Sequence, residues 1–223
     1  MKNPWVIIGI FTVVLFGGAI WLSGQSAEVN NEGVAVITHI KGNPEATVVL
    51  EEYSDLQCPA CASFAPVIAQ VLEEYGESIR FEYKHFPLPI HNYAMQAPVA
   101  AEAAGQQGKF FEFHDLLFEN QAAWAASPLP GTFFAQYAEE LELDMETFKR
   151  HQGSTILRDK VQSEMADGRA LGVRGTPTLF LNGARMEYNT IQEFVEQIAL
   201  AVDPAATAGA SSTAPVSDIK FGL

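Results

Sequence analysis

A strand, a helix and a second strand follow one another in the first half of the chain, and this pattern constrains the fold most. The stretch TVVLEEY (47–53) is short and β-branched, which is typical of a strand buried on both faces. From Pro59 to Gly76, apolar residues recur at three- and four-residue spacing, which predicts an amphipathic helix. SIRFEYKHF (78–86) predicts the second strand. The three form a β-α-β unit with parallel strands and a right-handed crossover.

The rest of the chain predicts a helical insertion at about 89–172, followed by a hairpin and a last helix. Helical patterns cover 93–107, 110–120, 131–141, 144–152 and 154–171. TPTLFLNG (176–183) predicts a strand and a turn, ARMEY (184–188) predicts its hairpin partner, and 190–202 predicts the final helix. Weak alternation over 34–40 predicts an additional edge strand.

The N-terminus predicts a membrane-spanning signal anchor. Trp5 to Leu22 contains no charged residue over 18 positions, and at ~1.5 Å per residue it spans roughly 27 Å, close to a bilayer core. The span is longer than the apolar region of a usual signal peptide, so we favour an uncleaved anchor over a cleaved signal. Lys2 precedes it, whereas Glu28 and Glu32 follow it with no Lys or Arg before Lys41. The positive-inside rule therefore makes 1–4 cytoplasmic and places the body outside the cytoplasm, in the cell envelope.

Composition predicts the remaining domain boundaries, and the net charge limits the kinds of binding partner. Residues 23–41 predict a linker with the possible edge strand, 42–202 the folded domain, and 203–223 a disordered tail rich in small residues. Thirteen Lys and Arg against 27 Asp and Glu give a formal net charge of −14. Nucleic-acid binding depends on basic contacts to phosphate, so this charge argues against a nucleic-acid partner.

The only two cysteines, Cys58 and Cys61, lie at the predicted start of the first helix. A helix N-terminus stabilises a thiolate, and three-residue spacing brings the two sulfurs onto one face, close enough for a disulfide. Thiol-disulfide exchange is therefore the favoured chemistry, with Cys58 exposed to the client and Cys61 as the resolving thiol. Two alternatives stay open: a metal site completed by His85, His91 or His114, and a pair of inert buried thiols.

Several stretches together resemble one known family. Their order and spacing resemble those of the DsbA-like thiol-disulfide oxidoreductases of the thioredoxin superfamily. The stretches are CPAC (58–61), VVLEEYSDLQCPACASF, FEYKHFPL, AAEAAGQQGKFFEFHDLLFENQ and ALGVRGTPTLFLNG. The resemblance covers about 42–202 and implies a thioredoxin-like α/β fold. It implies that Pro177 is cis beside the disulfide, that Thr176 offers backbone groups to a client segment, and that no cofactor is needed beyond the Cys58–Cys61 disulfide.

The resemblance also assigns a role to Glu52, six residues before Cys58. Similar enzymes carry a buried acid there that assists proton transfer at the resolving thiol. Alternation places Val48, Leu50 and Glu52 on one face of the strand, and one strand face is expected to lie beneath the helix that bears the cysteines. The alternative is a solvated glutamate at the strand end.

One departure from the family bears on the direction of electron flow. Pro59 and Ala60 stand where the strongest oxidases have Pro-His, so no cation lies between the thiols. Repulsion from Glu51, Glu52 and Asp55 is expected to raise the pKa of Cys58. Asp55 itself is expected to shape the turn before the helix.

The leading expectation is an extracytoplasmic, membrane-tethered enzyme that oxidises cysteine pairs in exported proteins through a Cys58 mixed disulfide. The family implies two kinds of partner, unfolded or partly folded exported proteins with cysteines and a membrane reoxidant or electron donor. The alternatives are a reductase or isomerase that uses the same residues, and a thioredoxin-like module that binds copper or zinc through both thiolates.

Overall fold

The computed structural model describes residues 12, 16, 28 and 30–204. The predicted anchor therefore lies outside the described residues except for Thr12 and Phe16, and the tail lies outside them from residue 205 onward. Among the described helices, none has both the length and the apolar character needed to cross a membrane.

In the described part of the chain, five strands form one sheet in the order β1-β3-β2-β4-β5. They are β1 (His39–Gly42), β2 (Val48–Ser54), β3 (Ile79–His85), β4 (Thr178–Leu181) and β5 (Ala184–Arg185). Strands β2 and β3 are parallel, as the β-α-β pattern predicts, and the other pairs are antiparallel. The edge strand exists but begins later than predicted, because pairing with β3 rather than local alternation defines its ends.

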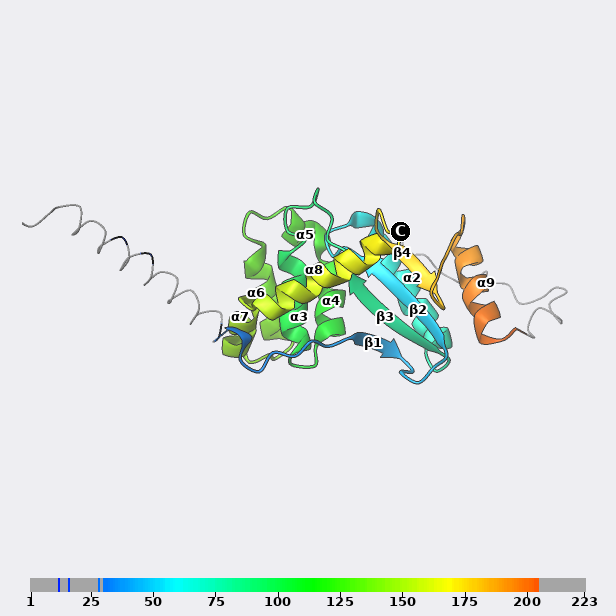
Figure 1. The fold of residues 1–223 in the computed structure, drawn as a ribbon, viewed down its shortest axis with the longest axis horizontal. Coiled ribbons are helices and arrows are strands. Elements are labelled where there is room, and N and C mark those ends of the chain that lie inside the picture. Colours follow the sequence, from blue (N-terminus) through cyan, green and yellow to red (C-terminus); the bar gives the residue numbers. More distant parts are fainter. Residues whose placement is uncertain (1–11, 13–15, 17–27, 29, 205–223) are drawn as a thin grey trace, which may run out of the picture.

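Helices cover both faces of the sheet and build a separate bundle beside it (Figure 1). They are α2 (Pro59–Tyr75), α3 (Gln96–Gly105), α4 (Phe110–Glu119), α5 (Gln121–Ala125), α6 (Pro130–Glu140), α7 (Met145–Gln152), α8 (Thr155–Ala170) and α9 (Ile191–Val202). Helix α8 runs across the bundle to the upper end of the sheet, α2 lies behind the sheet, and α3 to α7 gather at one side of it. The short helix α5 was not predicted, since five residues are too few to show a period.

The alternation of β2 orients the residues that matter for function. Val48, Leu50 and Cys61 belong to one buried cluster, so the face that carries Glu52 lies beneath α2. Tyr53, on the opposite face, packs in a second cluster with Phe180 and others below α8. The expectation that one face of this strand lies beneath the cysteine-bearing helix is confirmed, and it is the face that carries Glu52.

A buried charged cluster joins the helical bundle to the sheet, and Glu102 on α3 is its centre. Oε1 of Glu102 lies 2.9 Å from His39 Nε2, 3.0 Å from His85 Nε2 and 2.6 Å from Lys160 Nζ. Lys160 also bonds Glu164 at 2.8 Å, and Glu164 accepts the backbone N–H of His85 at 2.9 Å. Two strands and two helices are thus held together by one carboxylate.

Candidate active site

The turn between β2 and α2 places Cys58 at the start of the helix. Cys58 has extended backbone (φ −76°, ψ 121°) and caps α2, whose first residue is Pro59. Its N–H donates to Asp55 O at 2.9 Å. Both cysteines are free thiols; Cys58 is 7% exposed and Cys61 is fully buried. Cys58 is therefore the more accessible of the two sulfurs.

Asp55 shapes this turn, as expected. Its side chain accepts the N–H of Gln57 at 2.8 Å and the N–H of Leu88 at 2.8 Å. The same oxygen that binds Leu88 lies 2.8 Å from His91 Nδ1. Asp55 is 2% exposed, so its carboxylate ties the loop after β3 to the turn that presents Cys58.

Gln121 on α5 also supports the turn, and sequence reasoning missed it. Its buried side-chain amide donates to Leu56 O at 2.8 Å and to Cys58 O at 3.0 Å. This contact bridges more than sixty residues of chain, so no local pattern reveals it. The only signal available was its place at the end of the stretch that resembles the DsbA-like family.

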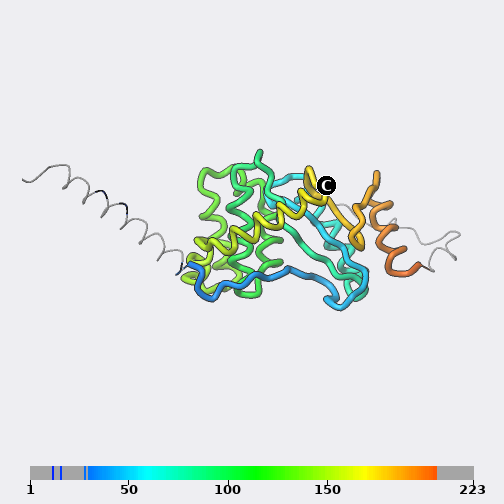
Figure 2. The backbone as a smooth tube through the Cα atoms, viewed as in Figure 1, coloured from blue at the N-terminus to red at the C-terminus, as the bar shows by residue number. Residues whose placement is uncertain are grey.

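The loop before β4 lies against Cys58. The Thr176–Pro177 peptide bond is cis, as the resemblance implied. The Cys58 thiol donates to Thr176 O at 3.5 Å. Figure 2 follows the chain from α8 through this loop and into β4. The structure therefore brings Cys58, Cys61, Thr176 and Pro177 together.

The environment of Cys58 stabilises its thiolate and lowers its pKa to about 5. The largest cause is a hydrogen bond from Cys61, and further hydrogen bonds from Thr176 and from the backbone at the helix start outweigh the opposing effect of burial. The expectation that nearby carboxylates raise this pKa is therefore wrong. Asp55 is occupied by its own donors, and Glu51 lies on the other face of β2.

Cys61 has the opposite character. Its pKa is raised far above the usual value by its hydrogen bond to Cys58, by burial and by the nearby charge of Glu52. One sulfur is thus a stabilised thiolate and the other a protonated thiol. This division fits a nucleophile at position 58 and a resolving group at position 61.

Glu52 is a buried acid below α2. It is 3% exposed, and burial raises its pKa to about 7 against a weaker opposing effect of Ser54. The alternative of a solvated glutamate is wrong. In the sheet, Glu52 lies opposite Tyr83 on β3 and Leu179 on β4, which provide no cation to offset its burial. A carboxyl that titrates near neutrality is suited to proton transfer, so the role predicted for Glu52 remains a prediction.

Replacing Glu52 by glutamine is expected to stabilise the reduced protein above pH 7. The folded pKa of about 7 exceeds the ordinary value of 4.5, so wild-type stability falls as pH rises through this window. At ~1.4 kcal/mol per pKa unit, the difference between 4.5 and about 7 predicts a gain of about 3 to 3.5 kcal/mol at pH 8 and little change at pH 4. Urea unfolding at both pH values measures it. Equal effects at the two pH values would contradict the assignment.

The histidines considered as metal ligands each have a carboxylate partner instead. His85 pairs with Glu102, His91 with Asp55, and His114 with Asp115. Within the described part of the chain, no group of three or more His, Cys, Asp or Glu side chains has the arrangement of a metal site.

Comparison with known proteins agrees with this geometry. A family model described as Thioredoxin matches residues 35–199. The chain belongs to this thioredoxin family. It is similar to the structure of a thioredoxin-like oxidoreductase from Silicibacter pomeroyi DSS-3, with 25% identity and a TM-score of 0.63 over 76% of this chain and 92% of that one. It is also similar to alpha-DsbA1 of Wolbachia pipientis, with 20% identity and a TM-score of 0.66 over 81% and 98% of the two chains.

The curated relatives of this thioredoxin-family chain are much longer. The Na(+)/H(+) antiporter NhaA 1 of Salinispora arenicola is 38% identical over 148 residues, which are 66% of this chain and 22% of that protein. The chain thus spans about a fifth of the length of the curated relatives it matches. The family model makes it a thioredoxin-family chain, and the solved structures show that it has the fold of thioredoxin-like oxidoreductases.

Proposed function

We propose that this enzyme is a membrane-tethered, extracytoplasmic oxidase that introduces disulfides into exported proteins. The observation that carries the proposal is the stabilised Cys58 thiolate at the start of α2, beside the Thr176–Pro177 loop. Stabilising the reduced form of a dithiol makes its disulfide a stronger oxidant. The substitution of Ala60 for a cation favours the opposite direction, a reductase or isomerase, and the same residues serve both.

The proposed cycle transfers two electrons from the client to the enzyme. A client thiolate attacks Cys58 of the Cys58–Cys61 disulfide, so a client–Cys58 bond forms and Cys61 leaves as a thiolate. Cys61 takes a proton from the carboxylic acid of Glu52. A second client thiolate attacks the client sulfur of the mixed disulfide, and Cys58 leaves as its stabilised thiolate. The client is oxidised, the enzyme is reduced, and a membrane oxidant accepts the electrons when the disulfide reforms.

The proposed location and partners follow from the first thirty residues and from the family. The uncharged Trp5–Leu22 span, with Lys2 before it and Glu28 and Glu32 after it, supports an anchor with the catalytic domain outside the cytoplasm. Such an anchor keeps the enzyme near a membrane reoxidant and near proteins that emerge unfolded. No cofactor beyond the Cys58–Cys61 disulfide is proposed.

The reduction potential of the cysteine pair tests the direction. We expect full-length protein in detergent, equilibrated with glutathione redox buffers and quenched by alkylation, to give a value near −120 mV, the oxidising end of the family range. A value near −270 mV would instead identify a tethered reductase. Metal analysis of the same preparation tests the copper or zinc alternative, which requires stoichiometric metal that is lost in Cys58→Ser.

A further inference from the structure

A small cavity lies directly against the buried acid of the active site. It has a volume of about 30 Å³ and lies between the sheet, α2 and α4. Its polar lining consists of Glu52, His114, Asp115 and Lys41, and the rest is apolar. A water molecule needs only ~10 to 15 Å³ and two or more polar partners, so the cavity has both the size and the lining for water.

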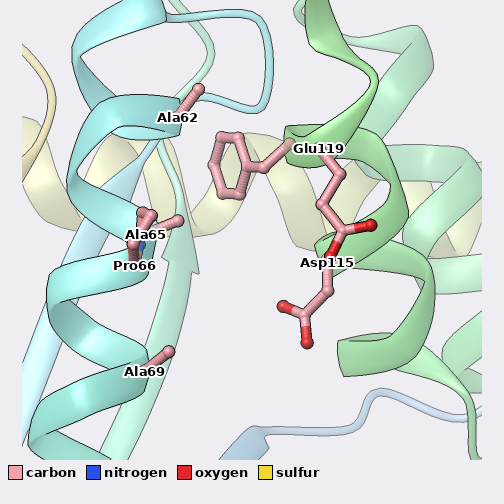
Figure 3. A pocket seen from close by; sticks show the side chains of 7 residues that line it. Ala62, Ala65, Pro66, Ala69, Asp115 and Glu119 are labelled. Carbon is pink, nitrogen blue, oxygen red and sulfur yellow. The ribbon is translucent and has the colours of Figure 1, made fainter. Parts of the chain in front are cut away.

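A larger groove opens on the outer side of the same helices. It has a volume of about 310 Å³ and is lined by α2 residues on one wall and by α4 residues on the other. Figure 3 shows Asp115 and Glu119 on α4 facing the small side chains of α2 across this groove. Ala65, Ala69 and Asp115 line both the inner cavity and the outer groove. The two spaces are therefore neighbours, separated by small side chains and one exposed carboxylate.

The α2 wall of the groove also carries a backbone acceptor. Pro66 lies inside α2 and lines the groove. Because proline has no N–H, it cannot donate to the carbonyl of Ala62, four residues earlier and also in the lining. A carbonyl released from the helical ladder adds hydrogen-bonding capacity for water to an otherwise apolar wall.

His114 is a titratable group in the lining of the inner cavity, and its partner Asp115 lines both spaces. Its Nδ1 lies 2.7 Å from Asp115 Oδ1, and pairing with a carboxylate favours a proton on Nδ1. Nε2 is then an acceptor that can take and release a proton. The ring is 8% exposed and packs edge to face on Tyr83 and Phe118, which fixes its orientation. Asp115 is about half exposed and also pairs with Lys41 at 3.3 Å.

Burial favours the uncharged form of both groups. Burial lowers the pKa of His114, Asp115 opposes this effect, and Lys41 and His85 reinforce it. Glu52 faces the thiol of Cys61 on α2 and Tyr83 on β3, and its own pKa is raised by burial. The imidazole is therefore uncharged at rest, and its free ring nitrogen holds a proton only transiently during exchange.

We propose that His114, oriented by Asp115, exchanges the proton of Glu52 with solvent through water in the inner cavity, and that the groove between α2 and α4 is the exit. The inference rests on the proposed exchange function, in which Glu52 must carry a proton when Cys61 leaves. In each exchange the carboxylic acid O–H bond breaks and a water proton reaches Nε2. The imidazolium then returns a proton to cavity water, which exchanges with water in the groove past Ala65, Ala69 and Asp115, so only protons move.

The test follows the proton of Glu52 directly, without a client. Reduced full-length protein in detergent is taken through a rapid pH jump from 6 to 8, and the infrared carbonyl band of protonated Glu52 is followed in time. The band is assigned by its absence in Glu52→Gln. We expect His114→Ala to slow its decay about tenfold or more, a typical effect of removing a positioned acid-base group. Added imidazole, which fits the space left by the ring, is expected to restore the rate in proportion to its concentration.

Matched variants separate proton transfer from a structural effect. His151→Ala removes another buried histidine, on α7, and is expected to leave the decay unchanged. Ala69→Leu fills the exit from an exposed position and is expected to slow the decay with His114 intact, whereas Ala122→Leu, exposed on α5, is not. The Ala69 variant also tests the route if His114→Ala does not fold.

The results that would overturn the proton route differ from those that would refute the proposed function. An unchanged decay in His114→Ala overturns the proposal, and so does a slower decay that imidazole does not restore, because that result indicates a structural role. Failure of the wild-type protein to exchange disulfides with any client would refute the proposed function, which this experiment does not measure.

Discussion

Replacing Cys58 by serine is expected to lower thiol-disulfide exchange by about three orders of magnitude or more. Only a thiolate attacks or leaves readily in this chemistry, and the Cys58 thiolate is the one that Cys61 and the backbone at the helix start stabilise. Cys61→Ser is expected to behave differently. It retains the nucleophile but lacks the resolving thiol, so it accumulates mixed disulfides with clients. Oxidation of a reduced, unfolded protein measures activity, and non-reducing electrophoresis after alkylation reveals the trapped species.

Ser63→Ala is the matched control for these two variants. Ser63 is exposed on the same helix, where its hydroxyl donates to Pro59 O at 3.0 Å, and its loss is expected to leave exchange unchanged. If Cys58→Ser retained activity, or if adducts formed through Cys61 in that variant, the assignment of the two roles would be reversed.

Glu102→Gln is expected to cost about 3 to 5 kcal/mol of unfolding free energy at pH 7, as when one member of a buried ion pair is removed. Glu102 is fully buried, and its loss leaves Lys160 to pair with Glu164 alone while His39 and His85 lose their carboxylate. Urea unfolding of the reduced protein measures the change. Glu112→Gln, on the exposed side of α4, is the control and should change stability by less than about 0.5 kcal/mol.

The same cluster predicts how stability changes in acid. Burial tends to raise the pKa of Glu102, but hydrogen bonds from His39 and His85 outweigh it and hold the pKa well below the ordinary value of 4.5. The stabilisation is therefore present above about pH 4.5 and is lost as pH falls below it. Glu102→Gln should remove most of this acid dependence. A variant that loses less than about 1 kcal/mol at pH 7 would contradict the structural role.

The sequence predicts the elements of this fold well because their signals are local. The spacing of apolar residues after Pro59 predicted α2, which ends at Tyr75, and the β-branched run predicted β2 to within one residue at each end. The local signals fail where strand pairing or a short element length determines the bounds of an element. Strand β1 is defined by its contact with β3, and α5 is too short for a period to appear.

The site was predictable only as far as its residues lie near the cysteines in sequence or in a recognisable motif. Cys58, Cys61, Thr176 and Pro177 meet as expected. The pKa of Cys58 was predicted in the wrong direction, because counting nearby carboxylates ignores which face each occupies and which donors it already has.

Gln121 and His114 are two site residues whose roles could not be predicted from the sequence. Their positions depend on how α4 and α5 pack against α2, which no local pattern encodes. A histidine before an aspartate on an amphipathic helix is an ordinary surface pattern. Only the folded arrangement shows that this pair lies between a buried acid and solvent.

The order of strands in the sheet has a consequence for how this enzyme matures. Strand β4 lies directly beside β2, although the whole helical insertion separates them along the chain, and the contact from Cys58 to Thr176 spans 118 residues. A nascent chain that ends within α8 already carries both cysteines but presents an unpaired edge of β2 in place of the completed site. Such long-range pairing forms late. The site around Cys58 is therefore complete only after nearly all of the folded domain has been synthesised.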